Sequence, residues 1–492
     1  MEQFDFLSRI CDHLETIPER RAFYISETSY TYGELGTLIA RIQSLIIPEL
    51  EEIDHVGVYI SDDIYTYASI LALWMSGRSF IPVNPQFPPS RNLKIMEQLE
   101  LKLLLHSKDI NPGLKAEKCA MVSTGNLSRT SSVRPRLQTF SRDKDAYVLF
   151  TSGSTGIPKG VRISFKNLNA FVRDFIQYPA YGFNHDDRFL QIYDLSFDAS
   201  VHCYTVPLAV GASVHTVAPD EIKYLAAYKL MEEQRLTFIK MPPSTLSYLR
   251  PYFSSVNLPD LKYCLLGGEA FPAGLAGEFE PCIPNALIQN VYGPTEVTVN
   301  CLIYDWSIPG GKRKELNGIA SIGKGFGTNK ILIDKSGELL VAGEQVSPGY
   351  WNNRVLDKKA FRVVESEGKL VRYYRTGDLV SMDDEGDVMF VGRNDEQIQV
   401  RGYRVELGEI ETLARTFLEG NNVMAFGIEE RTGEMQICLA VESEQLDVEI
   451  LRGHLTKQLP PYMIPEKIVP IPHFPNLVSG KLDRRAIKEL LS

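Results

Sequence analysis

Short apolar runs alternate with helix-like periodic segments along the first part of the chain. The runs, typical of buried strands, occupy residues 56–60, 79–83, 101–105, 146–150, 236–240, 263–267 and 286–290. Between them apolar residues recur at helical spacing, with helices expected through Trp74 and from Pro89. Thr31 and Glu34 form a capping box that predicts the start of another helix. This alternation predicts an α/β fold with mainly parallel sheets.

From about Asn329 the pattern changes to strands joined by the turn segments DKSGE and DDEGD, which indicates an antiparallel or barrel-like region. It changes again after Asp395, where helices are expected at 406–418 and 447–459 and strands at 421–430 and 434–443. We therefore expect a large domain of residues 1–394, with two parallel-sheet lobes and a barrel-like part. A small α+β domain is expected to follow at residues 395–492.

Composition narrows the function classes. Of 492 residues, 52 are basic and 62 acidic, so the formal net charge of -10 disfavours nucleic acids and acidic membranes. No stretch approaches the ~20 apolar residues that span a bilayer, and the N-terminal segment lacks a signal-peptide core, so we expect a cytoplasmic protein. The seven scattered cysteines are expected to be buried thiols. Metal-ligand spacings are absent from the sequence, so any metal is expected to arrive with a ligand.

The segment TSGSTGIPKG, residues 151–160, directly follows an apolar run. Its three glycines, four hydroxyl residues and one lysine describe a loop whose amides and side chains can bind a polyphosphate. The spacing differs from that of a Walker loop, because Lys159 lies between Pro158 and Gly160. Taken alone, the segment also fits a flexible surface turn.

This run resembles the phosphate loop of the adenylate-forming enzymes, which include acyl-CoA synthetases and nonribosomal-peptide adenylation domains. Further segments match that family's motifs, in its order, over nearly the whole chain: FDAS, GGEAFP, NVYGPTE, GELLVAGEQVSPGYW, YRTGDL, GRNDEQIQVRGYRVELGEIE, LPPYMIP and SGKLDR. The resemblance implies that a substrate carboxylate attacks the α-phosphate of ATP, forming an acyl-adenylate and expelling pyrophosphate. Because two anions must meet, the step depends on cations, oriented donors and positioning.

By the same resemblance, Lys481 is expected to be the cation that bridges the carboxylate and the α-phosphate. An isolated Ser-Gly-Lys segment would instead indicate a lysine exposed to solvent in a turn. Glu296 is expected to bind Mg²⁺ and Thr295 to hold phosphate, unless both simply begin a helix. Asp395 is the expected hinge of a mobile small domain, because the two half-reactions need different faces of it.

The resemblance also assigns residues to the nucleotide. Asp378 is expected to accept hydrogen bonds from the ribose, and Arg393 to reach the ribose or a phosphate. Tyr292 offers a flat face for adenine and Asn290 a donor and an acceptor for its edge, unless both only pack at a strand end. The remaining positions expected to contact ATP are Thr151, Ser152, Gly153, Ser154, Thr155, Gly156, Lys159, Gly268 and Glu269.

Asp198 in the FDAS motif bears on the substrate. In amino-acid-activating members of the family, an aspartate at this motif position pairs with the substrate α-ammonium. An unpaired buried carboxylate is costly, so a cationic substrate group is the natural partner. The alternative is that Asp198 caps the helix that follows.

The other walls of the substrate pocket follow from the family's specificity positions. Lys240, beside His202 and Asn300, suggests a polar or anionic substrate side chain such as that of aspartate, asparagine or glutamate. Lysine could instead extend to solvent from a pocket for something small. The wall positions are Ala199, His202, Lys240, Leu265, Gly267, Val291, Val299 and Asn300.

The acceptor of the activated group is expected to come from outside the chain, because no phosphopantetheine attachment motif follows SGKLDR. A separate carrier protein is the expected acceptor. Coenzyme A is the alternative, which would make the chain a small-acid:CoA ligase. A non-catalytic homologue would be expected to have lost Lys481, Glu296 or Asp378, and all three are present. The length and the uninterrupted small domain most resemble stand-alone D-alanine:carrier-protein ligases.

Overall fold

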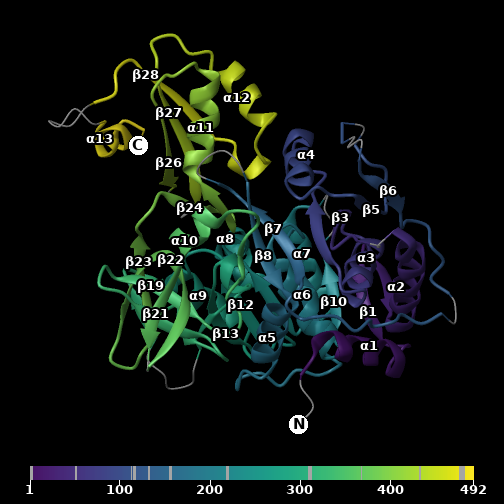
Figure 1. Cartoon of the computed structure of the whole chain (residues 1–492). Coiled ribbons are helices and arrows are strands. Elements are labelled where there is room, and N and C mark those ends of the chain that lie inside the picture. Colours follow the sequence, from purple (N-terminus) through teal and green to yellow (C-terminus); the bar gives the residue numbers. More distant parts are fainter. Residues whose placement is uncertain are drawn as a thin grey trace.

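The computed structural model describes residues 4–49, 52–111, 113–114, 118–130, 133–153, 158–217, 221–307, 313–366, 368–430, 434–475 and 482–491. Two large mixed sheets form its centre (Figure 1). The strands of the first are β1 Arg21–Ile25, β2 Thr28–Thr31, β9 Arg188–Gln191, β10 Ser213–Thr216, β11 Phe238–Met241, β12 Tyr263–Gly267, β13 Leu287–Tyr292, β14 Leu302–Asp305 and β17 Lys324–Gly325. Their order is β17-β14-β13-β12-β11-β9-β10-β1-β2. The strands from β13 to β1 run parallel, whereas β14, β17 and β2 are antiparallel to their neighbours.

The second large sheet contains β3 His55–Tyr59, β4 Ser79–Val83, β5 Leu103–His106, β6 Ala120–Ser123, β7 Asp145–Thr151, β8 Lys159–Ser164 and β20 Gly349–Tyr350. Its order is β20-β8-β7-β4-β3-β5-β6. The strands from β7 to β6 are parallel, and β8 and β20 add antiparallel strands at one side. Each apolar run predicted as a strand overlaps a strand of one of these sheets, so the α/β prediction is confirmed.

Helices fill the space between the two large sheets and cover their outer faces. One continuous cluster of buried side chains joins both sheets through α1 Phe6–Thr16, α2 Tyr32–Ile46, α3 Ile64–Met75, α5 Phe165–Ile176 and α6 Asp198–Ala209. A second cluster packs the outer face of the nine-stranded sheet against α7 Lys223–Glu233, α8 Pro243–Leu249 and α9 Ala273–Phe279. A third packs α4 Pro89–Gln98 on the seven-stranded sheet. Short 3₁₀ helices occupy Ile47–Glu49, Arg250–Ser255, Glu280–Cys282, Thr295–Val297 and Pro461–Met463.

The predicted capping box is confirmed at α2, where the Thr31 hydroxyl accepts from the Glu34 amide and the Glu34 carboxylate accepts from the Thr31 amide. The predicted antiparallel region is a five-stranded sheet of β18 Lys330–Ile333, β19 Glu338–Ala342, β21 Phe361–Ser366, β22 Lys369–Met382 and β23 Val388–Arg393. Helix α10 Arg354–Ala360 and the short pair β15 Glu315–Leu316 and β16 Ile319–Ala320 lie beside it in sequence.

Residues after β23 form a separate lobe at the top of the view in Figure 1. It begins with a hairpin of β24 Gln397–Val400 and β25 Tyr403–Glu406. A three-stranded sheet follows, with its own buried cluster under α11 and α12. The remaining elements are α11 Leu407–Phe417, β26 Val423–Glu429, β27 Met435–Glu442, α12 Val448–Thr456, β28 Lys467–Ile471 and α13 Arg484–Glu489.

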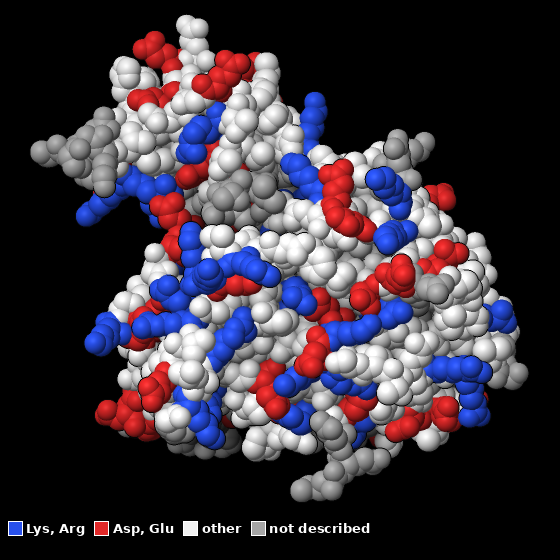
Figure 2. Space-filling model, in the orientation of Figure 1, with Lys and Arg blue, Asp and Glu red and all other residues white. Residues whose placement is uncertain are grey.

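Surface charge, helix hydrophobicity and the state of the cysteines complete the description. Lys and Arg are interspersed with Asp and Glu on the face that Figure 2 shows. Among the described helices, none has the length and apolar character needed to cross a membrane. The seven cysteines are free thiols, and all but Cys11 are buried.

Candidate active site

Four of the predicted site residues lie at one edge of the nine-stranded sheet. Asp198 follows β9, Lys240 lies near the end of β11, Gly267 ends β12 and Tyr292 ends β13. Because these strands are parallel, their carboxyl ends meet at the same edge, which is where open α/β sheets bind ligands. These four residues, which are separate along the chain, therefore lie at the same edge.

Asp198 is the first helical residue of α6, and Phe197 is the residue that precedes the helix. Its Oδ2 atom is buried without a hydrogen-bond partner. Burial raises the pKa of the Asp198 carboxyl to about 6, although Lys240 acts in the opposite direction. A buried carboxylate oxygen without a donor suits a ligand that brings one. The capping alternative does not account for this oxygen, because Asp198 lies inside the helix.

Lys240 is buried, with an exposed fraction of 2%, so the alternative in which it reaches solvent is wrong. Its ammonium donates to Asn300 Oδ1 over 2.7 Å and lies 3.2 Å from His202 Nδ1. It forms no ion pair with any carboxylate in the described part of the chain. Burial lowers the pKa of Lys240 to about 8, so the ammonium is charged at neutral pH.

His202 is fully buried one turn into α6, against the rings of Phe171 and Phe175. Burial first, and Lys240 second, hold the pKa of His202 well below its usual range. The ring is therefore neutral and accepts from Lys240 at Nδ1, which leaves the proton on Nε2. That Nε2 has no partner among the described residues.

A strained turn carries Val299 and Asn300. Thr298 and Val299 have φ values of 54° and 70°, a left-handed conformation that is costly for β-branched residues. Gln345, fully buried, holds the turn by donating to the carbonyls of Asn300 at 2.7 Å and Thr298 at 3.3 Å. The Thr298 hydroxyl in turn donates to the Gln345 carbonyl. Gln345 was not predicted from the sequence, although it lies in the matched run GELLVAGEQVSPGYW.

The remaining wall residues are small or apolar. Gly267 leaves no space for a side chain, because a Cβ atom there would lie 2.2 Å from the Val291 carbonyl oxygen. Leu265, Val291 and Val299 are buried, and Ala199 is partly exposed.

Three predicted nucleotide residues form a connected group at β13, β22 and β23. The Tyr292 hydroxyl donates to one oxygen of Asp378, and the Arg393 guanidinium pairs with the other. Arg393 also bonds both carboxylate oxygens of Asp395, at 2.7 and 2.8 Å. Burial raises the pKa of Asp378 although Arg393 opposes that shift. Asn290 is buried and its amide donates to the Ser321 carbonyl at 2.9 Å, as in the alternative in which it packs at the strand end.

The phosphate loop joins β7 to β8, and Ser154, Thr155 and Gly156 lie outside the described residues. Its described donors already contact oxygen atoms of the small lobe. The Lys159 ammonium lies 2.6 Å from Glu406, and the Gly153 amide donates to Glu409 at 3.0 Å. In this structure the lysine ammonium and the loop amide bind carboxylate oxygens. Phosphate oxygens need the same kind of donors, so the phosphates of ATP fit this loop.

Glu296 lies in the 3₁₀ turn after β13, beside Thr295, and is fully buried. Its carboxylate accepts from the Tyr350 hydroxyl and from Arg404, each at 2.7 Å. Burial alone would raise the pKa of Glu296, but Arg404 and Lys159 outweigh it and lower that pKa to about 2. Among the described residues no cluster of three or more metal-ligating side chains occurs. Glu296 is the carboxylate expected to hold Mg²⁺ together with ligand oxygens, and in this structure both of its oxygens accept from protein groups.

The hairpin of β24 and β25 lies over the site. The Gly402 amide donates to Glu269, which also accepts from the Ser244 amide and hydroxyl at 2.9 and 3.0 Å. Tyr403 stacks on Tyr462, with ring centroids 4.2 Å apart. Gly268 next to Glu269 has a φ of 83° and open space above it. Lys481 lies outside the described residues, so its position relative to this edge is not described.

Four charged residues lie where the small lobe contacts the site, and none was predicted from the sequence. Arg404, Glu406 and Glu409 belong to the small lobe, and Arg91 of the large lobe lies opposite Glu409. Arg91 and Glu409 form an ion pair of 2.7 Å in which the exposed fractions are 3% and 1%. For Arg404, Glu406 and Glu409 the available signal was the dense charge of the matched run RGYRVELGEIE, to which no role was attached. No such signal marked Arg91.

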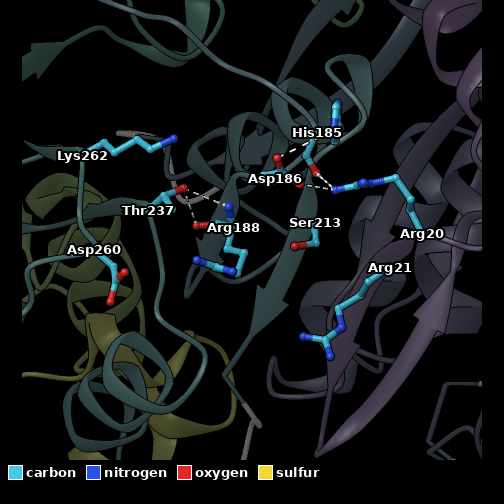
Figure 3. A pocket seen from close by; sticks show the side chains of 9 residues that line it. All are labelled: Arg20, Arg21, His185, Asp186, Arg188, Ser213, Thr237, Asp260 and Lys262. Carbon is cyan, nitrogen blue, oxygen red and sulfur yellow. Dashed lines mark hydrogen bonds and ion pairs between the residues drawn. The ribbon is translucent and has the colours of Figure 1, made fainter.

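A separate cavity of about 600 Å³ opens at the amino ends of the same sheet, opposite the site (Figure 3). It contains none of the predicted site residues. Its lining consists of Arg20, Arg21, His185, Asp186, Arg188, Ser213, Thr237, Asp260 and Lys262.

Solved adenylation proteins share this architecture. The structure superposes with a TM-score of 0.84 on a Vibrio cholerae adenylation domain, AlmE, solved with glycyl-adenosine-5'-phosphate, at 22% identity over 100% of this chain and 98% of that one. It also matches PA1221, a protein containing adenylation and carrier (PCP) domains, with a TM-score of 0.85 at 23% identity over 99% of this chain and 84% of that one. At these identities the likeness shows the fold.

Curated relatives are similar at the level of sequence. The D-alanine--D-alanyl carrier protein ligase of Bacillus velezensis is 31% identical over 516 aligned positions, covering 98% of this chain and 99% of the relative. Tyrocidine synthase 3 of Brevibacillus parabrevis is 29% identical over 97% of this chain, which spans only 7% of that relative's length. Residues 12–351 match the family described as AMP-binding enzyme. The chain therefore belongs to the AMP-binding family of adenylate-forming ligases, which use ATP.

Proposed function

We propose that the protein activates an α-amino acid with ATP, forming aminoacyl-AMP and pyrophosphate, and then transfers the aminoacyl group to the phosphopantetheine thiol of a separate carrier protein. The observation that carries the proposal is Asp198, whose buried Oδ2 lacks a donor at the carboxyl edge of the sheet. A substrate α-ammonium supplies the missing charge and donors.

The site residues have separate roles in the proposed first half-reaction. Asp198 orients the amino acid so that its carboxylate faces the phosphate loop. Lys159, Ser152 and Gly153 hold the phosphates, and Asp378 with Arg393 holds the ribose. Lys481, by its motif, neutralises charge between the carboxylate and the α-phosphate. When bound at Glu296, Mg²⁺ supplies charge neutralisation for the leaving pyrophosphate.

The second half-reaction needs the small domain in another orientation. Residues 1–394 and 395–492 act as the two moving bodies, with Asp395 as the hinge between β23 and β24. The described segment between these strands is only Asn394, Asp395 and Glu396, so few backbone torsions need to change.

The proposal also specifies the acceptor of the aminoacyl group and the side chain of the substrate. A carrier protein is supported by the relative from Bacillus velezensis, whose name states that it acts on one. The alternative acceptor is coenzyme A, which would make the protein a small-acid:CoA ligase. The charged, buried Lys240 beside His202 and Asn300 favours an acidic or amide side chain in the substrate.

Amino-acid-dependent exchange of labelled pyrophosphate into ATP tests the first half-reaction, across the twenty L-amino acids and several D-amino acids. We expect exchange with one amino acid or a small related group. Exchange only with acids that lack an α-amino group would contradict the role of Asp198 and favour the CoA-ligase alternative. Transfer assays with a phosphopantetheinylated carrier protein and with coenzyme A then separate the two acceptors.

A further inference from the structure

Five neighbouring parallel strands build the cavity at the amino ends of the nine-stranded sheet. Each strand contributes a polar residue at its first position or directly before it. These residues are Arg21 of β1, Arg188 of β9, Ser213 of β10, Thr237 before β11 and Lys262 before β12. Because the strands are parallel, side chains from distant parts of the chain meet here, at the edge opposite the proposed active site (Figure 3).

Three carboxylates lie at or beside this cavity, and each is already paired with a basic side chain. The pairs are Asp186 with Arg20, Asp187 with Lys262, and Asp260 with Arg235. The last pair is bidentate, because Arg235 donates to both oxygens of Asp260, at 2.8 and 3.0 Å. In the described lining, no carboxylate is therefore left over for a further cation.

Arg21 and Arg188 are the two arginines of the lining that remain. Neither pairs with a carboxylate among the described residues. Arg21 donates to the side-chain oxygen of Gln234 at 3.1 Å, and Arg188 donates through Nε to the Arg235 carbonyl at 2.8 Å. Both of these acceptors are neutral. Two positive charges are therefore left without a counter-charge at the cavity, in a chain whose net charge is -10.

The buried His215 shows that both arginines act on the same part of the cavity wall. It lies on β10, two residues after Ser213, and its Nε2 atom is 3.0 Å from the Ser213 hydroxyl oxygen. Burial first, and then Arg21 and Arg188, lower the pKa of His215 to about 3, so the ring is neutral at physiological pH. Figure 3 shows Ser213 between Arg21 and Arg188. Two guanidinium groups and one hydroxyl thus border the same space.

The chemistry of these groups selects a class of ligand. A guanidinium presents several N–H donors in one plane, which fits the oxygens of phosphate and carboxylate groups. A phosphate group carries a charge of about -1.5 to -2 at pH 7, so it balances two guanidinium charges better than a single carboxylate does. The cavity volume of about 600 Å³ lies within the range of about 300–1,000 Å³ that is typical of small-molecule sites. It therefore leaves room for a group attached to the phosphate.

We propose that this cavity binds a small phosphate-bearing ligand, either free phosphate or a phosphate ester. Arg21 and Arg188 pair with the phosphate oxygens, and the Ser213 hydroxyl donates to one of them. The site lies at the opposite edge of the sheet from the proposed ATP site, so it goes beyond the proposed function and does not depend on it.

Chemical labelling of the intact wild-type protein tests the site without relying on activity. Phenylglyoxal modifies accessible arginines, and peptide mass spectrometry measures the rate at each of them. At a phosphate concentration about ten times the Kd, about a tenth of the sites stay free, so modification of Arg21 and Arg188 should slow about tenfold. Arg250, which bonds Glu278 at 2.6 Å outside the cavity, should react at an unchanged rate.

Three probes distinguish the possible ligands: inorganic phosphate, glycerol 3-phosphate and malonate. Stronger protection of Arg21 and Arg188 by glycerol 3-phosphate assigns the site to a phosphate ester, and equal or stronger protection by inorganic phosphate assigns it to free phosphate. Malonate carries two carboxylates and controls for charge alone. Protection by malonate as strong as that by phosphate would contradict the choice of phosphate, and no protection by either phosphate probe would overturn the inference.

Calorimetric titration with the better phosphate probe separates this cavity from the phosphate loop. For Arg21→Gln and Arg188→Gln we expect a Kd at least about tenfold higher, because each variant loses a charge-assisted hydrogen bond to the ligand. Arg250→Gln removes the same charge outside the cavity, and this matched control should stay within about twofold of the wild type. Loss of binding in Lys159→Ala, with normal binding in both cavity variants, would place the probe at the phosphate loop alone and contradict the inference. The labelling test uses the wild type, so it decides the matter even if a variant does not fold.

Discussion

At the scale of single residues, the proposed function makes Lys240 the expected determinant of the substrate side chain. An ion pair about 4 Å long has a Coulomb energy of roughly 4 kcal/mol at an effective dielectric constant near 20, before desolvation is subtracted. We expect Lys240→Ala to lower kcat/KM for the acidic or amide substrate at least about tenfold and to favour smaller neutral amino acids. Pyrophosphate exchange with a panel of amino acids measures this. A wild type that prefers alanine or a large apolar residue, with its ranking unchanged in the variant, would contradict it.

Asp198 predicts a pH dependence of substrate binding. Because the pKa of Asp198 is raised to about 6, the carboxyl loses its charge as the pH falls through 6 and no longer attracts an ammonium. We expect the KM for the amino acid to rise about tenfold for each pH unit below 6, with little change between pH 7 and 8. Exchange assays from pH 5 to 8 measure this, and Asp198→Asn should flatten the profile. A wild-type KM that stays constant below pH 6 would exclude this role.

Lys481 predicts a separation of the two half-reactions. Its proposed charge is needed where the substrate carboxylate meets the α-phosphate, and not in transfer to a thiol. We expect Lys481→Ala to reduce pyrophosphate exchange by about a hundredfold or more, as loss of one oriented cation does. Transfer from a preformed adenylate should remain within a few-fold of the wild type. An equal loss of rate in both assays would contradict a specific role of Lys481 in adenylation.

At the scale of elements, the turn 297–300 is held in a strained conformation by Gln345. Replacing Gln345 with leucine leaves the buried Asn300 carbonyl without its side-chain donor, and the Thr298 carbonyl keeps only the Asn300 amide. We expect the free energy of unfolding of the large domain to fall by about 2 kcal/mol. Urea unfolding monitored by tryptophan fluorescence measures this. The same variant should lose selectivity between substrates, because Val299 and Asn300 are displaced together. An unchanged unfolding midpoint would show that the turn is stable without the Gln345 side chain.

Element boundaries were well predicted where apolar runs were flanked by clear signals. Ser79–Val83 and Tyr263–Gly267 coincide with strands β4 and β12, because both are buried on both faces of a parallel sheet. The order of strands was not predictable, since β1 lies beside β10 from nearly two hundred residues away. The buried Asn290 is a similar case, because its bond to Ser321 depends on how β13 packs in three dimensions.

At the scale of the whole molecule, the contacts between the lobes are what the sequence could least predict. Glu296 and Arg404 are 108 positions apart, and Lys159 and Glu406 are 247 positions apart. The motif match predicts roles for Glu296 and Lys159, because the charge of the expected ligand would explain them. It did not identify their partners, since these depend on the orientation of two bodies that each have a separate core.

The buried cysteines have a consequence for the chemistry of the whole molecule. An aminoacyl-adenylate reacts with any accessible thiolate, and Cys203 directly follows the pocket residue His202. Burial raises the pKa of Cys203 to about 12, and its Sγ contacts the Ala199 carbonyl at 3.4 Å inside α6. The same effect raises the pKa values of Cys264 and Cys301. Thiols that are buried and protonated in this way are poor nucleophiles, so the proposed aminoacyl-adenylate would be preserved for the proposed acceptor thiol.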